Sequence, residues 1–277
     1  MIIIIDSGGT KADWKIIDAE GSVHSQETEG YSPLLHDDVR LNQILLNLDI
    51  VLAEVNQVYY YGSGVHADLV RSGLHSLLQQ HFTGAEINIA SDLLGACRAA
   101  SGTAAGIVSI LGTGASTCVY DGQHIIDQVP SLGYILGDEG SGYALGKRIV
   151  QAFFYREMPA DIHELFVSGY PIDKSIVLDN VYKSSSANAF IASLANFAVE
   201  NKQHPYIRAL IREEFDQFIR RHLLKYEESG RLKCHFVGSL SWLLRDELCE
   251  RLAAHRLSPG TFVRKPIDRL ADFHTMI

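Results

Sequence analysis

The chain of 277 residues opens with a wholly apolar run, Ile2-Ile3-Ile4-Ile5, which stops at Asp6-Ser7-Gly8-Gly9. Consecutive β-branched residues are typical of a strand that is buried on both faces of a sheet. The apolar signal resumes at Trp14, Ile16 and Ile17, so the glycines predict a tight turn between two strands of a hairpin. An acidic residue therefore lies at a strand end, beside backbone that a ligand can approach closely.

The rest of the first half alternates strands with helices. A third strand is predicted over Gly21 to Glu29, and apolar residues at helical spacing from Val39 to Val55 predict one packed helix. Two units of strand, turn and helix follow, with strands at Val58 to Tyr61 and Ala85 to Ala90. Asp92 comes directly after the second strand, where Ser91 and Asp92 would serve equally well as a helix cap.

The same pattern then starts again at Ala105. Its predicted strands are Ala105 to Leu111, Thr117 to Tyr120, His124 to Val129, Cys234 to Val237 and Thr261 to Val263. A glycine turn from Gly112 to Ser116 follows the first of these, and Gly238-Ser239 follows the fourth. The repetition predicts two domains, residues 1–104 and 105–277, each of the form β-β-β-α-β-α-β-α.

A nearly pure helical pattern separates the third and fourth strands of the second half, and we expect a helical insertion over about residues 140–230. Its predicted helices are Gly140 to Arg156, Asp161 to Val167, Ser175 to Tyr182, Ala187 to Val199 and Tyr206 to Tyr226. Within the last of them, the charged run Arg212-Glu213-Glu214 is interpreted as a solvated face.

Composition and charge exclude several classes of protein. The formal net charge of -9 leaves no electrostatic footprint for nucleic acid or for an anionic membrane surface. The four cysteines are widely spaced without a CxxC pair, which argues against a zinc site and a disulfide scaffold. The apolar start is too short for a signal peptide, and no later run reaches spanning length. We therefore expect a cytoplasmic protein that binds neither nucleic acid nor membranes.

Each glycine turn taken singly is an ordinary hairpin more readily than a ligand loop. Because two such turns occupy corresponding places in two similar halves, they favour a pair of loops that hold a polyphosphate through backbone N–H groups. Asp6 is placed to hold a hydrated cation beside that anion, and it is also a common turn-forming residue.

Four motifs in order carry a family resemblance: Asp6-Ser7-Gly8-Gly9-Thr10-Lys11, Leu111-Gly112-Thr113-Gly114-Ala115-Ser116, Gly137-Asp138-Glu139-Gly140-Ser141-Gly142 and Val237-Gly238-Ser239. Over nearly its whole length, the chain resembles the N-acetylglucosamine kinase and acyl-CoA-dehydratase-activator ATPase family. That family belongs to the superfamily of sugar kinases, actin and heat-shock chaperones. The resemblance implies an α/β fold of two ribonuclease-H-like, actin-like ATPase domains that close on ATP and Mg²⁺, and it implies a homodimer.

The resemblance also implies roles for single residues. Asp6 would hold Mg²⁺ through water, and Asp92 would accept the proton of the attacking sugar hydroxyl. Contacts with ATP are implied for Ser7, Gly8, Gly9, Thr10, Lys11, Gly112, Thr113, Gly114, Gly238 and Ser239. Contacts with the sugar are implied for Ser32, Asp92, Thr113, Ser116, Asp138 and Glu139. A purely structural role is the alternative to ligand binding at two of these positions. Asp138 and Glu139 would then only stabilise a helix start, and Gly238 and Ser239 would form an ordinary strand-to-helix turn.

The function expected from this resemblance is ATP-dependent phosphorylation of an amino sugar, namely N-acetylglucosamine, glucosamine or N-acetylmuramic acid. Ser116, Tyr31-Ser32-Pro33 and Leu132 stand where family members acting on N-acetylglucosamine tend to have an asparagine, an Asn-containing loop and a tryptophan. One alternative is an ATPase that activates an electron-transfer partner through an iron–sulfur cluster, with Cys97 and Cys118 in about the right region. Another is a sugar- or nucleotide-binding module that does no chemistry.

Overall fold

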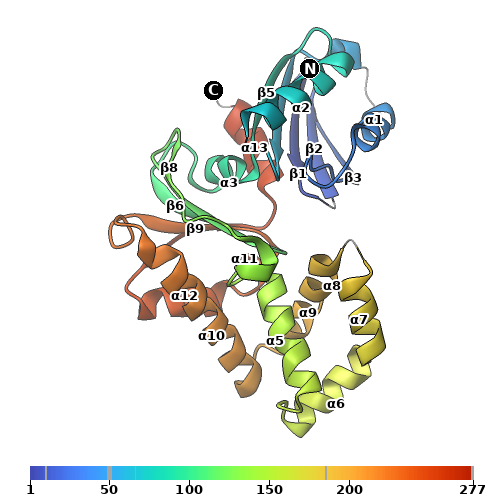
Figure 1. Cartoon of the computed structure of the whole chain (residues 1–277). Coiled ribbons are helices and arrows are strands. Elements are labelled where there is room, and N and C mark those ends of the chain that lie inside the picture. The colour runs from blue at the N-terminus through green and yellow to red at the C-terminus, as the bar shows by residue number, and fades with distance from the viewer. Residues whose placement is uncertain (10, 49–51, 66, 185, 276–277) are drawn as a thin grey trace. The chain divides into compact units, whose positions relative to one another are not determined.

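The computed structural model describes residues 1–9, 11–48, 52–65, 67–184 and 186–275 (Figure 1). These residues form two compact units. The first unit combines Met1–Ala104 with Lys265–Ile277, and the second is Ala105–Arg264. Each unit contains one sheet of five strands, so the predicted α/β architecture with two domains is confirmed.

The sheet of the first unit has the strand order β3-β2-β1-β4-β5. Its strands are β1 (Ile2–Ser7), β2 (Lys11–Ile17), β3 (Val23–Glu29), β4 (Gln57–Gly62) and β5 (Glu86–Ser91). Strand β2 is antiparallel to both of its neighbours, β1 and β3, whereas β1, β4 and β5 run parallel to one another. Ile3, Ile4 and Ile5 in the central strand are 0% exposed, which confirms the predicted burial on both faces.

Helices cover both faces of this sheet. They are α1 (Asp38–Leu46), the 3-10 helix η1 (Leu52–Glu54), α2 (Asp68–His81), α3 (Asp92–Ser101) and α13 (Pro266–Thr275). Ile3 and Ile5 share a core with residues of α1 and α2, such as Leu41 and Leu74. Ile4 packs in a separate cluster with Ala99 of α3 and with Ile267, Leu270 and Ala271 of α13.

The C-terminal helix α13, red in Figure 1, therefore belongs to the first unit. The sequence pattern predicts that residues 265–277 belong to the second domain, and the structure differs here. The reason is that the apolar face of α13 covers the Ile4 side of β1, which would otherwise be open to solvent.

The helix predicted from Val39 to Val55 is also different in the structure. Helix α1 ends at Leu46, and the N–H of Asn47 at its C-cap is shared between the carbonyls of Gln43 and Ile44, each at 3.2 Å. Asparagine and aspartate have low helix propensity, so Asn47 is a natural end. Residues 49–51 of the predicted helix lie outside the described residues.

The sheet of the second unit has the order β10-β9-β6-β7-β8. Its strands are β6 (Gly106–Leu111), β7 (Ala115–Tyr120), β8 (Ile125–Asp127), β9 (Lys233–Val237) and β10 (Ser258–Val263). Three antiparallel strands precede two parallel ones, as in the first unit, so the predicted repeat of strand order is confirmed. The last strand is longer than predicted, and it accommodates Pro259 because β10 lies at the sheet edge.

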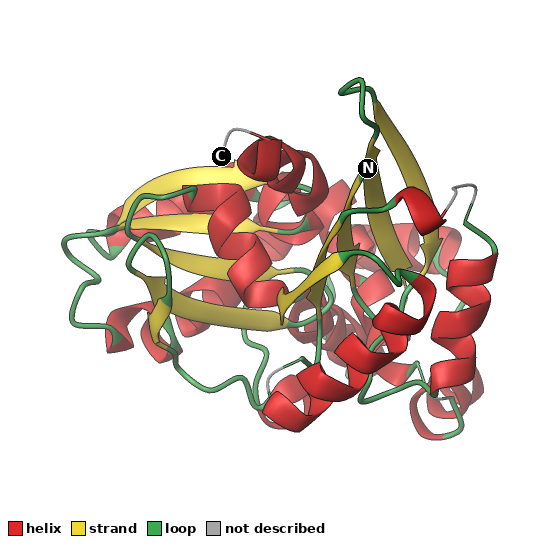
Figure 2. Ribbon diagram, turned by 90° about the horizontal axis from the view of Figure 1, so that it is seen from above, coloured by secondary structure: helices red, strands yellow, loops and turns green. Residues whose placement is uncertain are grey.

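Helices α4 to α10 lie in sequence between β8 and β9, and α11 and α12 lie between β9 and β10. They are α4 (Gly133–Leu136), α5 (Gly142–Phe154), α6 (Ala160–Gly169), α7 (Lys174–Tyr182), α8 (Ala187–Ser193), α9 (Ala195–Glu200), α10 (Pro205–Arg221), the 3-10 helix η2 (Leu223–Lys225), α11 (Ser239–Leu243) and α12 (Arg245–Ala254). Figure 2 shows these helices, in red, flanking the yellow strands. The helix predicted over Ala187 to Val199 is broken at Leu194 into α8 and α9.

Candidate active site

Two carboxylates lie at one edge of the sheet in the first unit. Asp6 is near the end of β1, and Asp92 directly follows the end of β5. Because β1, β4 and β5 run parallel, both acids lie at the carboxyl-end edge of these strands. Burial and, after it, the carboxylates of Asp92 and Asp13 together raise the pKa of Asp6 to about 7, with Lys265 opposing the rise. This edge concentrates negative charge that a bound cation would neutralise.

Of the two residues predicted as a helix cap, Ser91 is the N-cap of α3 in the structure. The Ser91 Oγ accepts a hydrogen bond of 3.2 Å from the N–H of Leu94. Asp92 is the first residue of α3, and its Oδ1 accepts a hydrogen bond of 2.8 Å from the N–H of Leu93. The side chain of Asp92 is therefore oriented by its neighbour, at a helix end that favours negative charge.

The turn between β1 and β2 is closed by one backbone hydrogen bond. The N–H of Gly8 donates to the carbonyl oxygen of Lys11 at 2.9 Å. A Cβ at Gly9 would lie 3.1 Å from Cδ1 of Leu35, so a larger residue would press on the neighbouring loop. The ammonium of Lys11 forms an ion pair with Glu27 of β3. Thr10, predicted to contact ATP, lies outside the described residues.

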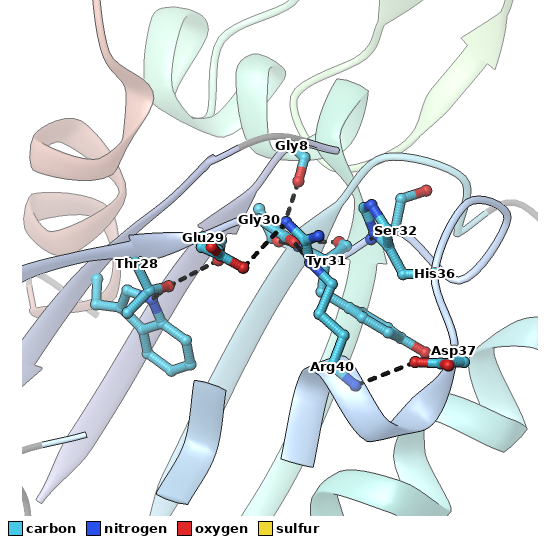
Figure 3. A network of polar contacts seen from close by, with 11 residues as sticks. Gly8, Thr28, Glu29, Gly30, Tyr31, Ser32, His36, Asp37 and Arg40 are labelled. Carbon is cyan, nitrogen blue, oxygen red and sulfur yellow. Dashed lines mark hydrogen bonds and ion pairs between the residues drawn. The ribbon is translucent and has the colours of Figure 1, made fainter. Parts of the chain in front are cut away.

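Ser7 and Ser32 hold the loop that follows β3, of which Figure 3 labels Tyr31, Ser32 and His36. The Ser7 hydroxyl donates to the carbonyl of Tyr31 at 2.9 Å and accepts from the N–H of Tyr31 at 3.0 Å. The Ser32 hydroxyl donates to the carbonyl of Ser63 at 3.2 Å, and its N–H donates to Nδ1 of His36 at 3.1 Å. Both serines are almost fully buried, at 1% and 2% exposure, so their hydroxyls position backbone.

The second hairpin turn is bonded to the start of α5. The N–H of Gly112 donates to the carbonyl of Gly114 at 3.1 Å, which closes the turn between β6 and β7. In the first turn of α5, the N–H groups of Gly142 and Tyr143 donate to the carbonyls of Gly112 and Thr113, at 2.8 and 3.0 Å. These bonds satisfy helix donors and fix the turn against the helix.

Asp138 packs directly on this second turn. It has a φ of 63° and is 8% exposed, and a Cβ at Gly114 would lie 2.9 Å from its Oδ2. Burial raises the pKa of Asp138, while hydrogen bonds from the N–H of Ala115 and the hydroxyl of Ser131 lower it. The glycine at position 114 is therefore required for the close approach of this carboxylate. Ser116, also predicted to bind sugar, lies in β7 opposite Ile110 of β6.

The two residues after Asp138 are held by the end of α10. Glu139 forms ion pairs with Arg221 and with Nε2 of His222, the latter at 3.1 Å. The N–H of Gly140 donates to Oε1 of Glu214 at 2.9 Å. Glu214 is only 5% exposed, so its interpretation as part of a solvated face is wrong.

A cavity of about 270 Å³ lies in the second unit beside the hairpin turn. Its lining includes Gly112, Thr113, Gly142, Ala192, Asn196, Ser239 and Leu243. The cavity thus brings together predicted ATP contacts from two distant motifs. Gly238, which precedes α11, has a φ of 122°, and a Cβ there would lie 2.4 Å from the carbonyl oxygen of Leu111. The strand-to-helix turn therefore requires glycine for a close backbone approach.

The chain was also compared with known proteins. No protein-family model matches it, and no curated protein matches it. Among solved structures, a proposed N-acetylglucosamine kinase from Porphyromonas gingivalis matches with a TM-score of 0.93 and 32% sequence identity, over 99% of this chain and 98% of its own. The chain belongs to the N-acetylglucosamine kinase family. The predicted resemblance is therefore confirmed.

Two further structures share the fold of the family at lower identity. A proposed N-acetylglucosamine kinase from Chromobacterium violaceum is 19% identical with a TM-score of 0.77, over 98% of both chains. A glucokinase of the ROK family from Streptomyces griseus, in complex with glucose and AMPPNP, is 16% identical with a TM-score of 0.56, over 98% of both chains. Among the described residues, no helix has the length and apolar character needed to cross a membrane.

The sequence motifs did not indicate three residues that the structure places around the site, namely Ser131, Asn196 and Glu214. The buried residues of α10 include Ile207, Ile211, Glu214 and Phe218, so Glu214 falls on the apolar face at helical spacing. That spacing was a usable signal for burial. Ser131 and Asn196 lie in no recognisable pattern, and only the folded chain brings them to Asp138 and to the cavity.

Proposed function

We propose that the protein transfers the γ-phosphoryl group of ATP to a hydroxyl of an amino sugar. The candidate acceptors are N-acetylglucosamine, glucosamine and N-acetylmuramic acid. The observation that carries this proposal is the placement of Asp6 and Asp92 at one sheet edge, in a chain whose family relative is a proposed N-acetylglucosamine kinase. One acid suits the metal of a nucleotide, and the other suits the proton of an acceptor.

Asp6 fits the role of a magnesium anchor. Mg²⁺ usually binds through one or two carboxylates and substrate phosphates, and it keeps several waters. Within the described part of the chain, no group of three or more His, Cys, Asp or Glu side chains is placed to hold a metal ion. Asp6 is buried beside the carboxylates of Asp92 and Asp13, and these three acids suit a cation that is only partly bound by protein. When bound with ATP, Mg²⁺ would neutralise charge that develops on the phosphates.

Asp92 fits the role of general base. The acceptor hydroxyl gives its proton to the Asp92 carboxylate as the new P–O bond forms and the bond between the γ-phosphorus and the ADP oxygen breaks. The N–H of Leu93 holds Oδ1 of this carboxylate at 2.8 Å, which keeps the side chain from rotating away. Most of the rate enhancement in such a transfer comes from positioning, so this restraint matters.

We assign ATP and sugar contacts in the second unit. Gly112, Thr113 and Ser239 line the cavity of about 270 Å³ and would contact ATP, as would Gly238, which directly precedes Ser239. Asp138, next to the hairpin turn, would accept hydrogen bonds from sugar hydroxyls. We infer that Glu139 acts through Asp138, because its own carboxylate is engaged by Arg221 and His222.

Four finer features stay predictions. We infer that each unit is a ribonuclease-H-like ATPase domain, as the resemblance implies, and that helices α4 to α10 form an insertion in the second, as the helical pattern predicts. A homodimer stays a prediction from the resemblance, and a cytoplasmic location stays a prediction from the cysteines and the apolar pattern.

An activator-type ATPase is less well supported by the cysteines. Cys97 in α3 and Cys118 in β7 are each 0% exposed. A cluster shared between two subunits needs thiolates that reach the subunit surface. The burial of both side chains therefore favours the kinase over the activator.

A substrate panel tests the proposal. Purified protein is incubated with ATP and Mg²⁺ and with N-acetylglucosamine, glucosamine, N-acetylmuramic acid, glucose or no sugar, and ADP release is measured. We expect release that depends on an amino sugar and on Mg²⁺. Tight sugar binding without ADP release would support a binding module instead, and sugar-independent ATP hydrolysis by an iron-containing protein would support an activator.

A further inference from the structure

A second cavity in the second unit, of about 370 Å³, lies between α4, α5 and α10. Its lining includes Tyr134, Glu139, Tyr143, Lys147, Arg148 and Arg221. Among all the lining residues, Gly137 and Glu139 alone belong to the motifs that indicate ATP or sugar binding. The volume is in the range of sites that hold a small organic molecule and exceeds what a single ion needs.

The carboxylates in this cavity are paired within the protein, whereas some of its cationic groups are available to a ligand. Glu139 is paired with Arg221 and His222, and Glu214 accepts from Gly140 and lies 3.7 Å from Arg148. The side chain of Lys147 is exposed and makes no hydrogen bond or ion pair with any residue that the structure describes, and its charge acts on the carboxylate of Glu214. The side chain of Arg221 is 61% exposed and uses Nη1 for Glu139, so its other nitrogens remain donors toward the cavity. The available groups are therefore cationic, while the carboxylates are already engaged.

Two tyrosines in the cavity wall indicate which chemical group would be bound together with an anion. The rings of Tyr134 and Tyr143 meet edge to face with centroids 5.0 Å apart, and both line the cavity. Tyrosine offers an apolar ring and a hydroxyl, which suits the mixed surface of a sugar ring. Lysine and arginine together suit a phosphate group.

We propose that this cavity binds a phosphorylated monosaccharide, with Lys147 and Arg221 holding the phosphate and Tyr134 and Tyr143 contacting the sugar ring. The residues that line this cavity are distant from Asp92 in the sequence. The cavity is also a different one from the cavity that Ser239 lines. It would let a sugar phosphate regulate the protein without entering the acceptor site.

The loop from Gly137 to Ser141 links this cavity to Asp138. Asp138 packs on the hairpin turn at Gly114, whereas the next residue, Glu139, pairs with Arg221 in the cavity wall. A phosphate bound to the other nitrogens of Arg221 shares the charge of the guanidinium with Glu139, which weakens their ion pair. Weakening that ion pair loosens the residue adjacent to Asp138, so occupancy raises the KM for the acceptor sugar. This last step rests on the proposed function; the binding itself does not.

Isothermal titration calorimetry without ATP tests the binding. The probes are glucosamine 6-phosphate, inorganic phosphate and uncharged N-acetylglucosamine. We expect glucosamine 6-phosphate to bind Lys147→Glu at least about tenfold more weakly than wild type, because a charge-assisted contact becomes repulsive. Lys147→Arg should keep most of the affinity. Lys233→Glu, the same charge change at an exposed site outside the cavity, should bind like wild type.

The results of the titrations distinguish binding in this cavity from binding elsewhere on the protein. Equal binding by wild type and Lys147→Glu would place the sugar phosphate elsewhere and overturn the proposal, and so would the absence of binding to wild type. Inorganic phosphate binding as tightly as glucosamine 6-phosphate, with the same loss in Lys147→Glu, would assign the cavity to free phosphate and overturn the sugar as occupant. If the panel reveals an acceptor sugar, glucosamine 6-phosphate should raise its KM in wild type more than in Lys147→Glu.

Discussion

The main-chain N–H of Gly140 donates a hydrogen bond of 2.9 Å to the buried carboxylate of Glu214. This bond ties the loop that carries Asp138 to helix α10. Gly140 has a φ of 80°, and a Cβ there would lie 2.8 Å from Cβ of Phe218, so backbone and helix are in close contact. The loop is therefore held by packing and by one buried acceptor.

Glu214→Ala should destabilise the second unit and loosen the Asp138 loop. The buried N–H of Gly140 would lose its acceptor, which costs about 1–3 kcal/mol. Chemical denaturation measures the free energy of unfolding, and we expect KM for the acceptor sugar to rise. Glu214→Gln keeps an acceptor oxygen and should retain most of the stability. Equal losses in the two variants would show that charge, and not the hydrogen bond, is what matters.

Asp92→Asn should remove phosphoryl transfer while leaving the fold intact. The amide oxygen of asparagine can still accept from the N–H of Leu93, but the side chain cannot take a proton from the acceptor hydroxyl. We expect kcat to fall by about 10²–10⁴, with calorimetric binding of the sugar retained. Asp68→Asn is the matched control, because Asp68 is likewise the first residue of a helix, α2. A similar loss of kcat in Asp68→Asn would point to a general effect of helix charge.

Gly114→Ala should weaken sugar binding through Asp138. The added Cβ would lie 2.9 Å from Oδ2 of Asp138 and must displace that carboxylate. We expect a rise of roughly tenfold in KM for the sugar, equivalent to about 1.4 kcal/mol. Gly112→Ala in the same turn meets no atom within 4 Å and should leave the sugar KM unchanged. Steady-state kinetics with saturating ATP measures both, and equal effects on the sugar KM would contradict the role of Asp138.

The first unit should lose stability in acid because of His274. The hydroxyl of Tyr61 accepts from Nη1 of Arg98 at 2.6 Å, so its own proton is directed to Nε2 of His274 at 2.7 Å. Burial and, after it, the charge of Arg98 together lower the pKa of His274 from 6.5 to about 4. The unfolded chain therefore takes up a proton near pH 6.5, whereas the folded chain does so only near pH 4. Lowering the pH across this window favours unfolding.

Denaturation of wild type and His274→Gln at several pH values measures this effect. Between pH 6.5 and pH 4, wild type should lose about 1–2 kcal/mol more than the variant, after a discount for partial exposure of the ring. Other groups titrate alike in both proteins and cancel in the difference. Parallel stability curves would show that His274 is not held neutral by the fold.

Local sequence patterns were sufficient to predict the order of the strands along the chain and the positions of the glycine turns. The run Ile2 to Ile5 predicted a strand with two buried faces because β-branched residues without polar alternation leave no solvent face. The motif around Gly137 to Gly142 indicated the family because its residues are contiguous. Asp6 and Asp92 were identified as strand-end acids from local sequence too: Asp6 directly follows an apolar run, and Asp92 comes after the alternating strand Ala85 to Ala90 and Ser91.

Contacts between distant segments needed the tertiary structure. Helix α13 joined the first unit because its apolar face meets Ile4, a contact that spacing along the chain does not encode. Glu214 is buried because the N–H of Gly140 needs an acceptor, and Ser7 and Ser32 turned out to hold backbone because the loop at Tyr31 passes over them. The sequence by itself determined which residues are chemically suited to a kinase. The fold decided which of them face a cavity and which hold the scaffold, because hydrogen bonds over long sequence separations form only once the chain has packed.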